Sequence, residues 1–213
     1  MSYTTPIVFV VDDDVAVREA LEMLIGSAGW QPETFASAEE FLTCPRCHAP
    51  RCLVLDVTLP DLSGLELQKR IAADDVNMPI VFISGYGDVP MTVQAMKGGA
   101  VEFLTKPLQG ELMLAAIENA IERSHAALER EEGMRVLRGH YASLTCRERQ
   151  VMALVVSGLL NKQVAGELEI SEITVKAHRG NAMRKMKARS FAEMVTMSTR
   201  LNHNPFPVGR MAN

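Results

Sequence analysis

The chain has 213 residues, of which 47% are hydrophobic, with 22 Lys and Arg against 26 Asp and Glu. This length exceeds what one small domain needs, so we expect two domains. No apolar stretch is long enough to span a membrane, and the first residues lack the basic and apolar regions of a signal peptide, so the sequence predicts a cytoplasmic protein.

The charges are divided unevenly along the chain. Residues 1–123 carry 8 Lys and Arg against 18 Asp and Glu, whereas residues 124–213 carry 14 against 8. A basic half joined to an acidic half suggests that the basic part meets a polyanion. Charge alone leaves open a basic surface that is only solvated.

The first half alternates strand and helix patterns. Short runs of β-branched and apolar residues predict strands, and apolar residues at helical spacing predict helices. We expect strands at 7–11, 31–35, 52–56, 79–83 and 101–105, and helices at 15–28, 38–42, 64–73, 89–97 and from 109 onward. Five strands alternating with helices predict an α/β fold, in which a parallel sheet is covered by helices on both faces.

Polar side chains follow four of these strands. Asp12 and Asp13 follow the first strand, Asp56 ends the third, Ser84 follows the fourth, and Lys106 follows the fifth. Parallel strands place their carboxyl ends on one edge of the sheet, so these side chains can converge. Taken alone, Asp56 could equally be a capping residue on a turn from strand to helix.

The converging set has a definite chemistry. Three carboxylates at close quarters repel one another, and hard oxygen ligands of this kind suit Mg²⁺. Lys106 can pair with a transferred phosphoryl group, and the Ser84 hydroxyl can donate to a phosphoryl oxygen. The set is therefore suited to phosphoryl transfer onto a carboxylate nucleophile.

These residues resemble the receiver domain of two-component response regulators over about residues 5–123. The resemblance rests on Asp12-Asp13, Asp56 with Pro60 and Gly64, Ser84-Gly85, and the run from Phe103 to Pro107. It implies a flavodoxin-like fold with a five-stranded parallel sheet in the order 2-1-3-4-5. It also implies that this domain receives a phosphoryl group from a sensor histidine kinase.

The same resemblance implies a role for each site residue. Asp56 is the phosphoacceptor, and Mg²⁺ is held by Asp12, Asp13, Asp56 and the backbone carbonyl of Thr58. Ser84 and Phe103 form the switch that rearranges on phosphorylation. By the same pattern, the third acid of the first run, Asp14, lies outside the metal site and caps the first helix.

A cysteine-rich stretch between the second and third strands stays open to several interpretations. Cys44, Cys47 and His48 have the spacing of a c-type haem attachment site, which would need an exported protein. With Cys52 they could also form a zinc site, or the cysteines could form a redox disulfide. The simplest alternative is a polar loop with Cys52 as a small core residue.

The second half is predicted to be all helix. We expect a linker at 124–142, helical in character, a DNA-binding domain at 143–202 and a flexible tail at 203–213. Predicted helices are 147–156, 162–168, 172–189 and 190–201. Thr145 with Glu148 forms a capping-box pattern, and Asn161 and Ser171 are the expected caps of the next two helices.

This half closely resembles the four-helix DNA-binding domain of the LuxR/NarL type over about residues 140–202. On the third helix, Val175, His178, Ala182 and Met186 should face inward. A basic face with small residues lets a helix enter the major groove. The predicted DNA contacts are Asn161, Lys162, Thr174, Lys176, Ala177, Arg179, Gly180 and Arg184. Lys176 is the best candidate for base readout, and Lys162 for phosphate contact. Cys146 stands where this family usually has proline.

The combination most resembles the FixJ branch of response regulators. It implies a transcription regulator that forms a homodimer on phosphorylation through its fourth helix and fifth strand. Its partners would be the kinase, a two-fold operator in double-stranded DNA, and RNA polymerase. We expect no enzyme activity beyond its own phosphoryl transfer and dephosphorylation.

Two other functions compete with this prediction. The receiver could be a docking module that works without phosphorylation. A phosphotransferase of the haloacid type would also use an aspartyl-phosphate, but it needs a second Asp two residues after Asp56, where this chain has Thr58.

Overall fold

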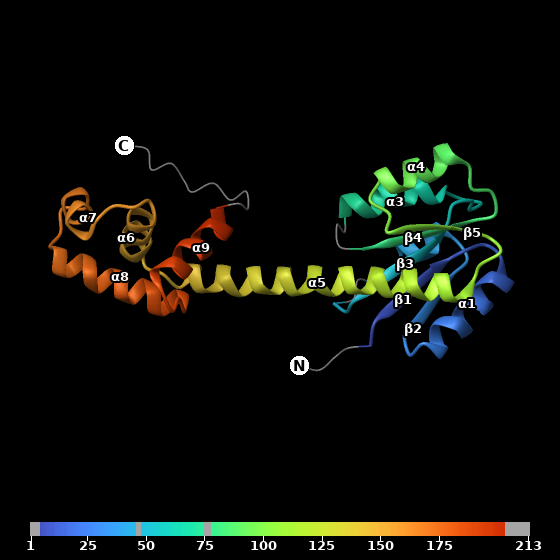
Figure 1. Cartoon of the computed structure of the whole chain (residues 1–213), viewed down its shortest axis with the longest axis horizontal. Helices are drawn as coiled ribbons and strands as arrows, with labels where there is room; N and C mark the ends of the chain where they lie inside the picture. Colours follow the sequence, from blue (N-terminus) through green and yellow to red (C-terminus); the bar gives the residue numbers. More distant parts are fainter. Residues whose placement is uncertain (1–4, 46–47, 75–77, 203–213) are drawn as a thin grey trace. The chain divides into compact units, whose positions relative to one another are not determined.

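The structure is a computed structural model that describes residues 5–45, 48–74 and 78–202. The chain divides into two compact units, Met1–Arg130 and Glu131–Asn213. Figure 1 labels the elements of both units along the chain. Within the described ranges, no helix combines the length and apolarity that crossing a membrane requires.

The first unit contains the predicted parallel sheet. Its strands are β1 (Ile7–Val11), β2 (Gln31–Phe35), β3 (Arg51–Asp56), β4 (Ile80–Ser84) and β5 (Glu102–Thr105). They pair in the order β2-β1-β3-β4-β5, which confirms the predicted fold class and strand order. The helices are α1 (Val15–Ser27), α2 (Ala38–Leu42), α3 (Gly64–Asp74), α4 (Val89–Lys97) and α5 (Gly110–Ala142).

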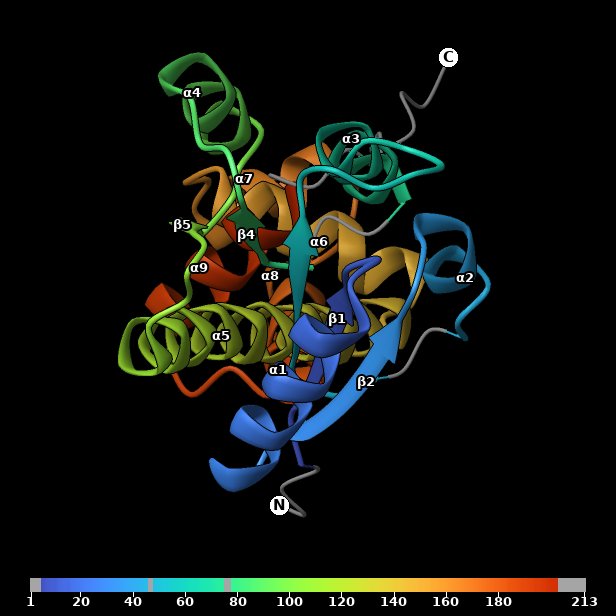
Figure 2. The same ribbon diagram turned by 90° about the vertical axis from the view of Figure 1, so that its right-hand side faces the viewer.

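Helices cover the sheet on both faces, as Figure 2 shows for α1 and α5 on one side and α2 and α3 on the other. Alternate strand residues point to opposite faces, so each face has its own core. Met113 and Ile117 of α5 pack with Leu21 of α1 on one face. Leu67 of α3 and Ala95 of α4 pack on the other.

The register of the sheet brings the predicted site residues to one edge. Val11 lies opposite Leu55, and Leu55 lies opposite Phe82, so β1, β3 and β4 end almost level with one another. Ser84 in turn lies opposite Thr105. The residues that end or directly follow these four strands are therefore neighbours.

The second unit is helical. It contains the last turns of α5, followed by α6 (Cys146–Val156), α7 (Asn161–Glu167), α8 (Glu172–Met186) and α9 (Phe191–Asn202). Its core includes Leu137 of α5 and the buried side chains of Val151, Val164 and Val175. The segment 124–142 is thus helical, and part of it packs within the second unit.

Two local predictions in this unit are wrong. Asn161 does not cap α7, because Leu160 stands at the cap and its N–H donates to the side chain of Gln163 at 2.8 Å. The helix α8 ends at Met186 instead of continuing to 189, because Lys187 adopts a left-handed conformation with φ of 54°. The capping box of Thr145 and Glu148 at α6 is confirmed.

Cys52 is a core residue of β3. Burial raises the pKa of its thiol to about 12, and its side chain packs among the core residues of the sheet, in agreement with the interpretation of Cys52 as a small core residue. Cys47 lies outside the described residues. The haem, zinc and disulfide hypotheses for the other members of this stretch remain predictions.

Candidate functional site

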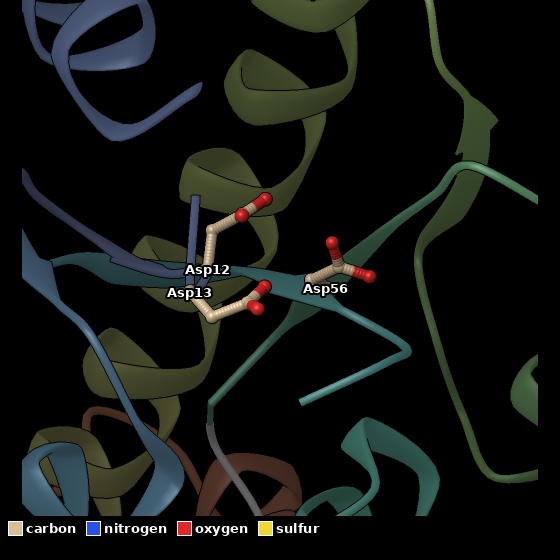
Figure 3. Close-up of side chains that lie close together, drawn as sticks. All are labelled: Asp12, Asp13 and Asp56. Carbon is tan, nitrogen blue, oxygen red and sulfur yellow. The ribbon is translucent and has the colours of Figure 1, made fainter. Parts of the chain in front are cut away.

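Three carboxylates meet where β1 and β3 end. Oxygen atoms of Asp12, Asp13 and Asp56 lie within 4.8 Å of one another, as the close-up in Figure 3 illustrates. Asp12 is fully buried and Asp56 is 5% exposed, whereas Asp13 is exposed. The site is thus open to solvent on the side of Asp13.

Lys106 supplies the positive charge of this site. Its Nζ lies 2.8 Å from Oδ2 of Asp12 and 2.5 Å from Oδ2 of Asp56. The residue is held there because β5 ends beside β4, and the Lys106 N–H donates to the carbonyl of Ser84 at 2.8 Å. One ammonium group therefore bridges two buried carboxylates.

Burial and charge act against each other on these groups. Burial, with a smaller contribution from Asp56, raises the pKa of Asp12 despite the hydrogen bonds from Lys106 and from the Asp14 N–H. Burial would lower the pKa of Lys106, but its pairing with Asp12 and Asp56 outweighs this, and the pKa is raised. Lys106 is therefore a cation at neutral pH.

The backbone that carries Asp12 and Asp13 is fixed by two neighbours. Asp14 caps α1, accepting from the Ala16 N–H at 2.8 Å. Arg18 donates from one guanidinium nitrogen to the carbonyls of Asp12 at 2.7 Å and Asp13 at 3.0 Å. Sequence reasoning missed Arg18, because a bond to backbone carbonyls leaves no signal in the residue type.

A glycine allows the chain to pass close to Asp56. A Cβ at Gly64 would lie only 2.3 Å from the carbonyl oxygen of Asp56. The Gly64 N–H donates to the Val57 carbonyl at 2.9 Å, which ties the start of α3 to the end of β3. Thr58 lies next in this loop, and its N–H donates to Oδ1 of Asp56 at 2.9 Å.

The predicted switch residues lie on β4 and β5. Ser84 is buried, and its hydroxyl donates to the carbonyl of Tyr86 at 2.9 Å. Phe103 is half-buried, with its ring centroid 6.2 Å from that of Phe82. A Cβ at Gly87 would lie 3.1 Å from the Phe103 ring, so the glycine leaves room for this aromatic side chain.

The donor set fits a hard divalent cation. Carboxylate oxygens from two strand ends, one side of them open to water, are the ligands that Mg²⁺ prefers. Lys106 offsets one of the three negative charges of Asp12, Asp13 and Asp56. A divalent cation would offset the other two. Which atoms would hold the ion, including the carbonyl of Thr58, stays a prediction.

The predicted DNA-contact residues lie around α7 and α8. Lys176, Ala177, Gly180 and Arg184 are exposed, and Thr174 is half-buried. Lys176 pairs with Glu172 at 3.3 Å. The inward face of α8 is confirmed for Val175, Ala182 and Met186, which are buried, while His178 is half-buried.

Arg179 and Asn161, both predicted DNA contacts, are partners of each other inside the unit. The guanidinium of Arg179 lies 4.9 Å from the centre of the Phe191 ring and 3.4 Å from the side-chain oxygen of Asn161. Arg179 therefore links α8 to α7 and α9. Lys162 is exposed at the start of α7.

Known families match both units. Residues 8–118 match the family described as response regulator receiver domain, and residues 142–198 match bacterial regulatory proteins of the luxR family. The chain is 48% identical to Nodulation protein W of Bradyrhizobium diazoefficiens, over 93% of this chain and 87% of that protein. The chain belongs to the two-component response regulators.

Other relatives agree with this assignment. Transcriptional regulatory protein FixJ of Bradyrhizobium diazoefficiens is 42% identical over 91% of this chain and 94% of its own length. The solved structure of the response regulator StyR has a TM-score of 0.83 and 47% identity, and the match covers 92% of this chain and all of that chain.

This family combines a receiver with a DNA-binding domain, and its members are transcription regulators rather than metabolic enzymes. The receiver implies a sensor kinase as partner, and phosphorylation by such a kinase is typical of the family. The luxR-type domain implies binding to DNA.

Proposed function

We propose that this response regulator is activated when a sensor histidine kinase transfers a phosphoryl group to Asp56. The observation that carries this proposal is the arrangement around Asp56, which lies beside two further acids and in direct contact with Lys106. An oxygen of Asp56 forms the new bond to phosphorus as the bond to the donor group breaks. Apart from this transfer and the hydrolysis of the aspartyl phosphate, which frees the Asp56 carboxylate and releases inorganic phosphate, we propose no enzyme activity.

Each neighbour of Asp56 has a separate role. Asp12, Asp13, Asp56 and the Thr58 carbonyl would hold Mg²⁺, which when bound supplies positive charge for the phosphoryl oxygens. Lys106 can turn one of its donors from Asp56 to the incoming phosphoryl group. Its hydrogen bond to Asp12 would keep the ammonium group close to Asp56 during this change of partner.

The switch follows from a change of hydrogen-bond partner. Ser84 donates to the Tyr86 carbonyl here, and it would donate to a phosphoryl oxygen after transfer. This movement draws the loop after β4 toward Asp56 and leaves space into which the Phe103 ring can turn. Phe103 would thus carry the change to the surface formed by α4 and β5.

That surface suits association with a second copy of the chain. Tyr86 is 91% exposed and Val89 is 76% exposed, and Val93 and Met96 add further exposed apolar area on α4. Exposed apolar groups of this kind favour protein contacts. We propose that phosphorylation biases an equilibrium toward a homodimer through α4 and β5.

A dimer would present two copies of α8 to a two-fold operator in double-stranded DNA. Lys176 would read a base edge and Lys162 would contact phosphate, with the other predicted DNA-contact residues around them. RNA polymerase is the partner on which a bound regulator acts. We propose the cytoplasm as the site of action, since that is where these DNA and polymerase partners would be met.

Acetyl phosphate with Mg²⁺ tests the proposal, with intact mass as the measurement. We expect one added phosphoryl group on the natural chain and none on Asp56→Asn. Asp14→Asn is the matched control, because Asp14 is adjacent in sequence but caps α1, and asparagine caps equally well. No adduct on the natural chain would contradict the proposal and favour a docking module that works without phosphorylation. An adduct that persists on Asp56→Asn would also contradict it, because the phosphoryl group would then be on another residue.

A further inference from the structure

One side of α8 is exposed along its whole length. A helix turns 100° per residue, so residues three and four apart share a side. The buried side carries Val175, Ala182 and Met186. The opposite side carries the α8 stripe, a row of four exposed residues, Ile173, Ala177, Gly180 and Arg184.

The α8 stripe has an uneven profile. Ala177 and Gly180 in its middle are small, and a Cβ added at Gly180 would meet no atom within 4 Å. The helix backbone can therefore approach a groove closely at this point. Ile173 projects at the N-terminal end of the stripe, and the positively charged Arg184 projects at the other.

Ile173 is a large apolar side chain that the second unit does not bury. It is 79% exposed, on the side of α8 opposite the fully buried Val175. Its polar neighbours have partners of their own, since the Thr174 hydroxyl lies 2.7 Å from that of Ser171 and Lys176 pairs with Glu172. Ile173 is thus the prominent apolar group of the first turn of α8.

The first turn of a recognition helix is the part that reaches the base edges. Among the four bases, thymine alone presents a methyl group in the major groove, and an apolar side chain can contact it. We propose that Ile173 contacts the methyl group of a thymine and so helps to set operator specificity. This inference rests on the proposed role of α8 as the recognition helix.

Replacing thymine by deoxyuridine tests the contact, because only the methyl group is removed. A preferred site is first selected from random double-stranded DNA with the phosphorylated full-length protein. Each thymine in the site is then replaced in turn. We expect one position per half-site at which the change weakens binding about four-fold, the effect of one buried methyl group.

The variant Ile173→Ala completes the test. It should bind the unmodified site about four-fold or more weakly and should no longer distinguish thymine from deoxyuridine at that position. Ile173→Val, the matched control, should keep most of the distinction. Binding to unrelated DNA should be unchanged in both variants, since neither alters charge.

Two results would overturn the inference. One is a selected site without any position sensitive to the thymine methyl. The other is Ile173→Ala with the same deoxyuridine sensitivity as the natural chain. Both leave sequence-selective binding intact and so leave the proposed function standing. Failure of the natural chain to select any sequence would instead overturn the role of α8, and this inference with it.

Discussion

Lysine side chains in the two units have contrasting surroundings. Lys106 is held between two buried carboxylates, whereas Lys162 is exposed and Lys176 forms an exposed ion pair with Glu172. An exposed ion pair of this kind contributes little to stability, so Lys176 can exchange Glu172 for DNA at small cost. The two exposed lysines are therefore available for binding.

Alanine substitution should separate base readout from phosphate contact. We expect Lys176→Ala to weaken binding to the selected operator more than binding to unrelated DNA, whereas Lys162→Ala should weaken both equally. Titrations of both DNAs by fluorescence anisotropy measure this. Lys69→Ala, which removes an exposed lysine of the receiver, is the control. Equal losses for Lys176→Ala and Lys162→Ala would contradict the assigned roles.

The acidic residues of the site could be predicted because each one lies at or just after the end of a strand. The rule that parallel strands end on one edge brings Asp12, Asp13 and Asp56 together, and the receiver resemblance separates them from Asp14. The partners of Arg18 could not be predicted, since they are backbone carbonyls. The pair of Glu148 and Lys185 joins residues 37 positions apart, and no local pattern connects them.

Among the elements, the turn from β3 into α3 depends on close backbone packing. Gly64→Ala should destabilise the first unit by about 2 kcal/mol, because the added methyl group would overlap the Asp56 carbonyl. Urea denaturation followed by the fluorescence of Trp30, the single tryptophan, measures this. Gly26→Ala in α1 is the control, since its Cβ meets no atom within 4 Å, and it should be neutral or slightly stabilising.

The start of α6 depends on a buried charge. The Glu148 side chain accepts from the Thr145 N–H at 2.8 Å and from Lys185 at 2.6 Å. These two contacts hold the pKa of Glu148 below its usual range, and the contact with Lys185 has the larger effect. Because the pKa is lowered on folding, this stabilisation is fully present at pH values above the ordinary glutamate pKa. It is lost as the pH falls through the pKa of Glu148 in the folded state. The second unit should therefore lose stability in acid.

Glu148→Gln tests this dependence. We expect it to lower the unfolding free energy of the second unit by about 2 kcal/mol at pH 7, because it leaves Lys185 without its charged partner. The difference from the natural chain should shrink as pH falls from about 4.3, the ordinary pKa of glutamate, through the lower folded-state pKa of Glu148. Denaturation followed by circular dichroism measures both. A difference that stays constant between pH 7 and pH 3 would contradict the ionic interpretation.

Glu193→Gln provides the comparison for this prediction. Glu193 also accepts from a backbone N–H just before its own helix α9, that of Arg189 at 2.7 Å. A glutamine can also accept this bond, so the loss should be well below that of Glu148→Gln. An equal loss of unfolding free energy for Glu193→Gln and Glu148→Gln would mean that the helix-capping bond alone, without the Lys185 pair, explains the effect of Glu148→Gln.

Most elements could be predicted because their apolar residues repeat at regular spacing. The ends of α7 and α8 could not. Asn161 is a favoured cap by residue type, yet its side chain bonds to Arg179 and the backbone cap falls one residue earlier. Lys187 ends α8 in a conformation that glycine more often adopts, so the sequence gives no stop signal there.

The whole molecule joins an acidic unit to a basic one. Negative charge on the receiver should oppose binding of the same chain to unrelated DNA. We expect the fragment 131–213 to bind unrelated DNA several-fold more tightly than the full chain at about 50 mM salt, with a smaller difference at about 200 mM. Anisotropy titrations at the two salt concentrations measure this. A difference independent of salt would assign the effect to steric blocking.

The bridge that Lys106 makes to Asp12 and Asp56 has a consequence for how the protein matures. The chain carries its own counter-ion, so part of the negative charge of its most acidic corner is compensated once β5 joins the sheet. We therefore expect the amount of folded protein to depend little on magnesium. A magnesium ion at this site would then affect how readily Asp56 receives a phosphoryl group, and leave the number of folded receivers unchanged.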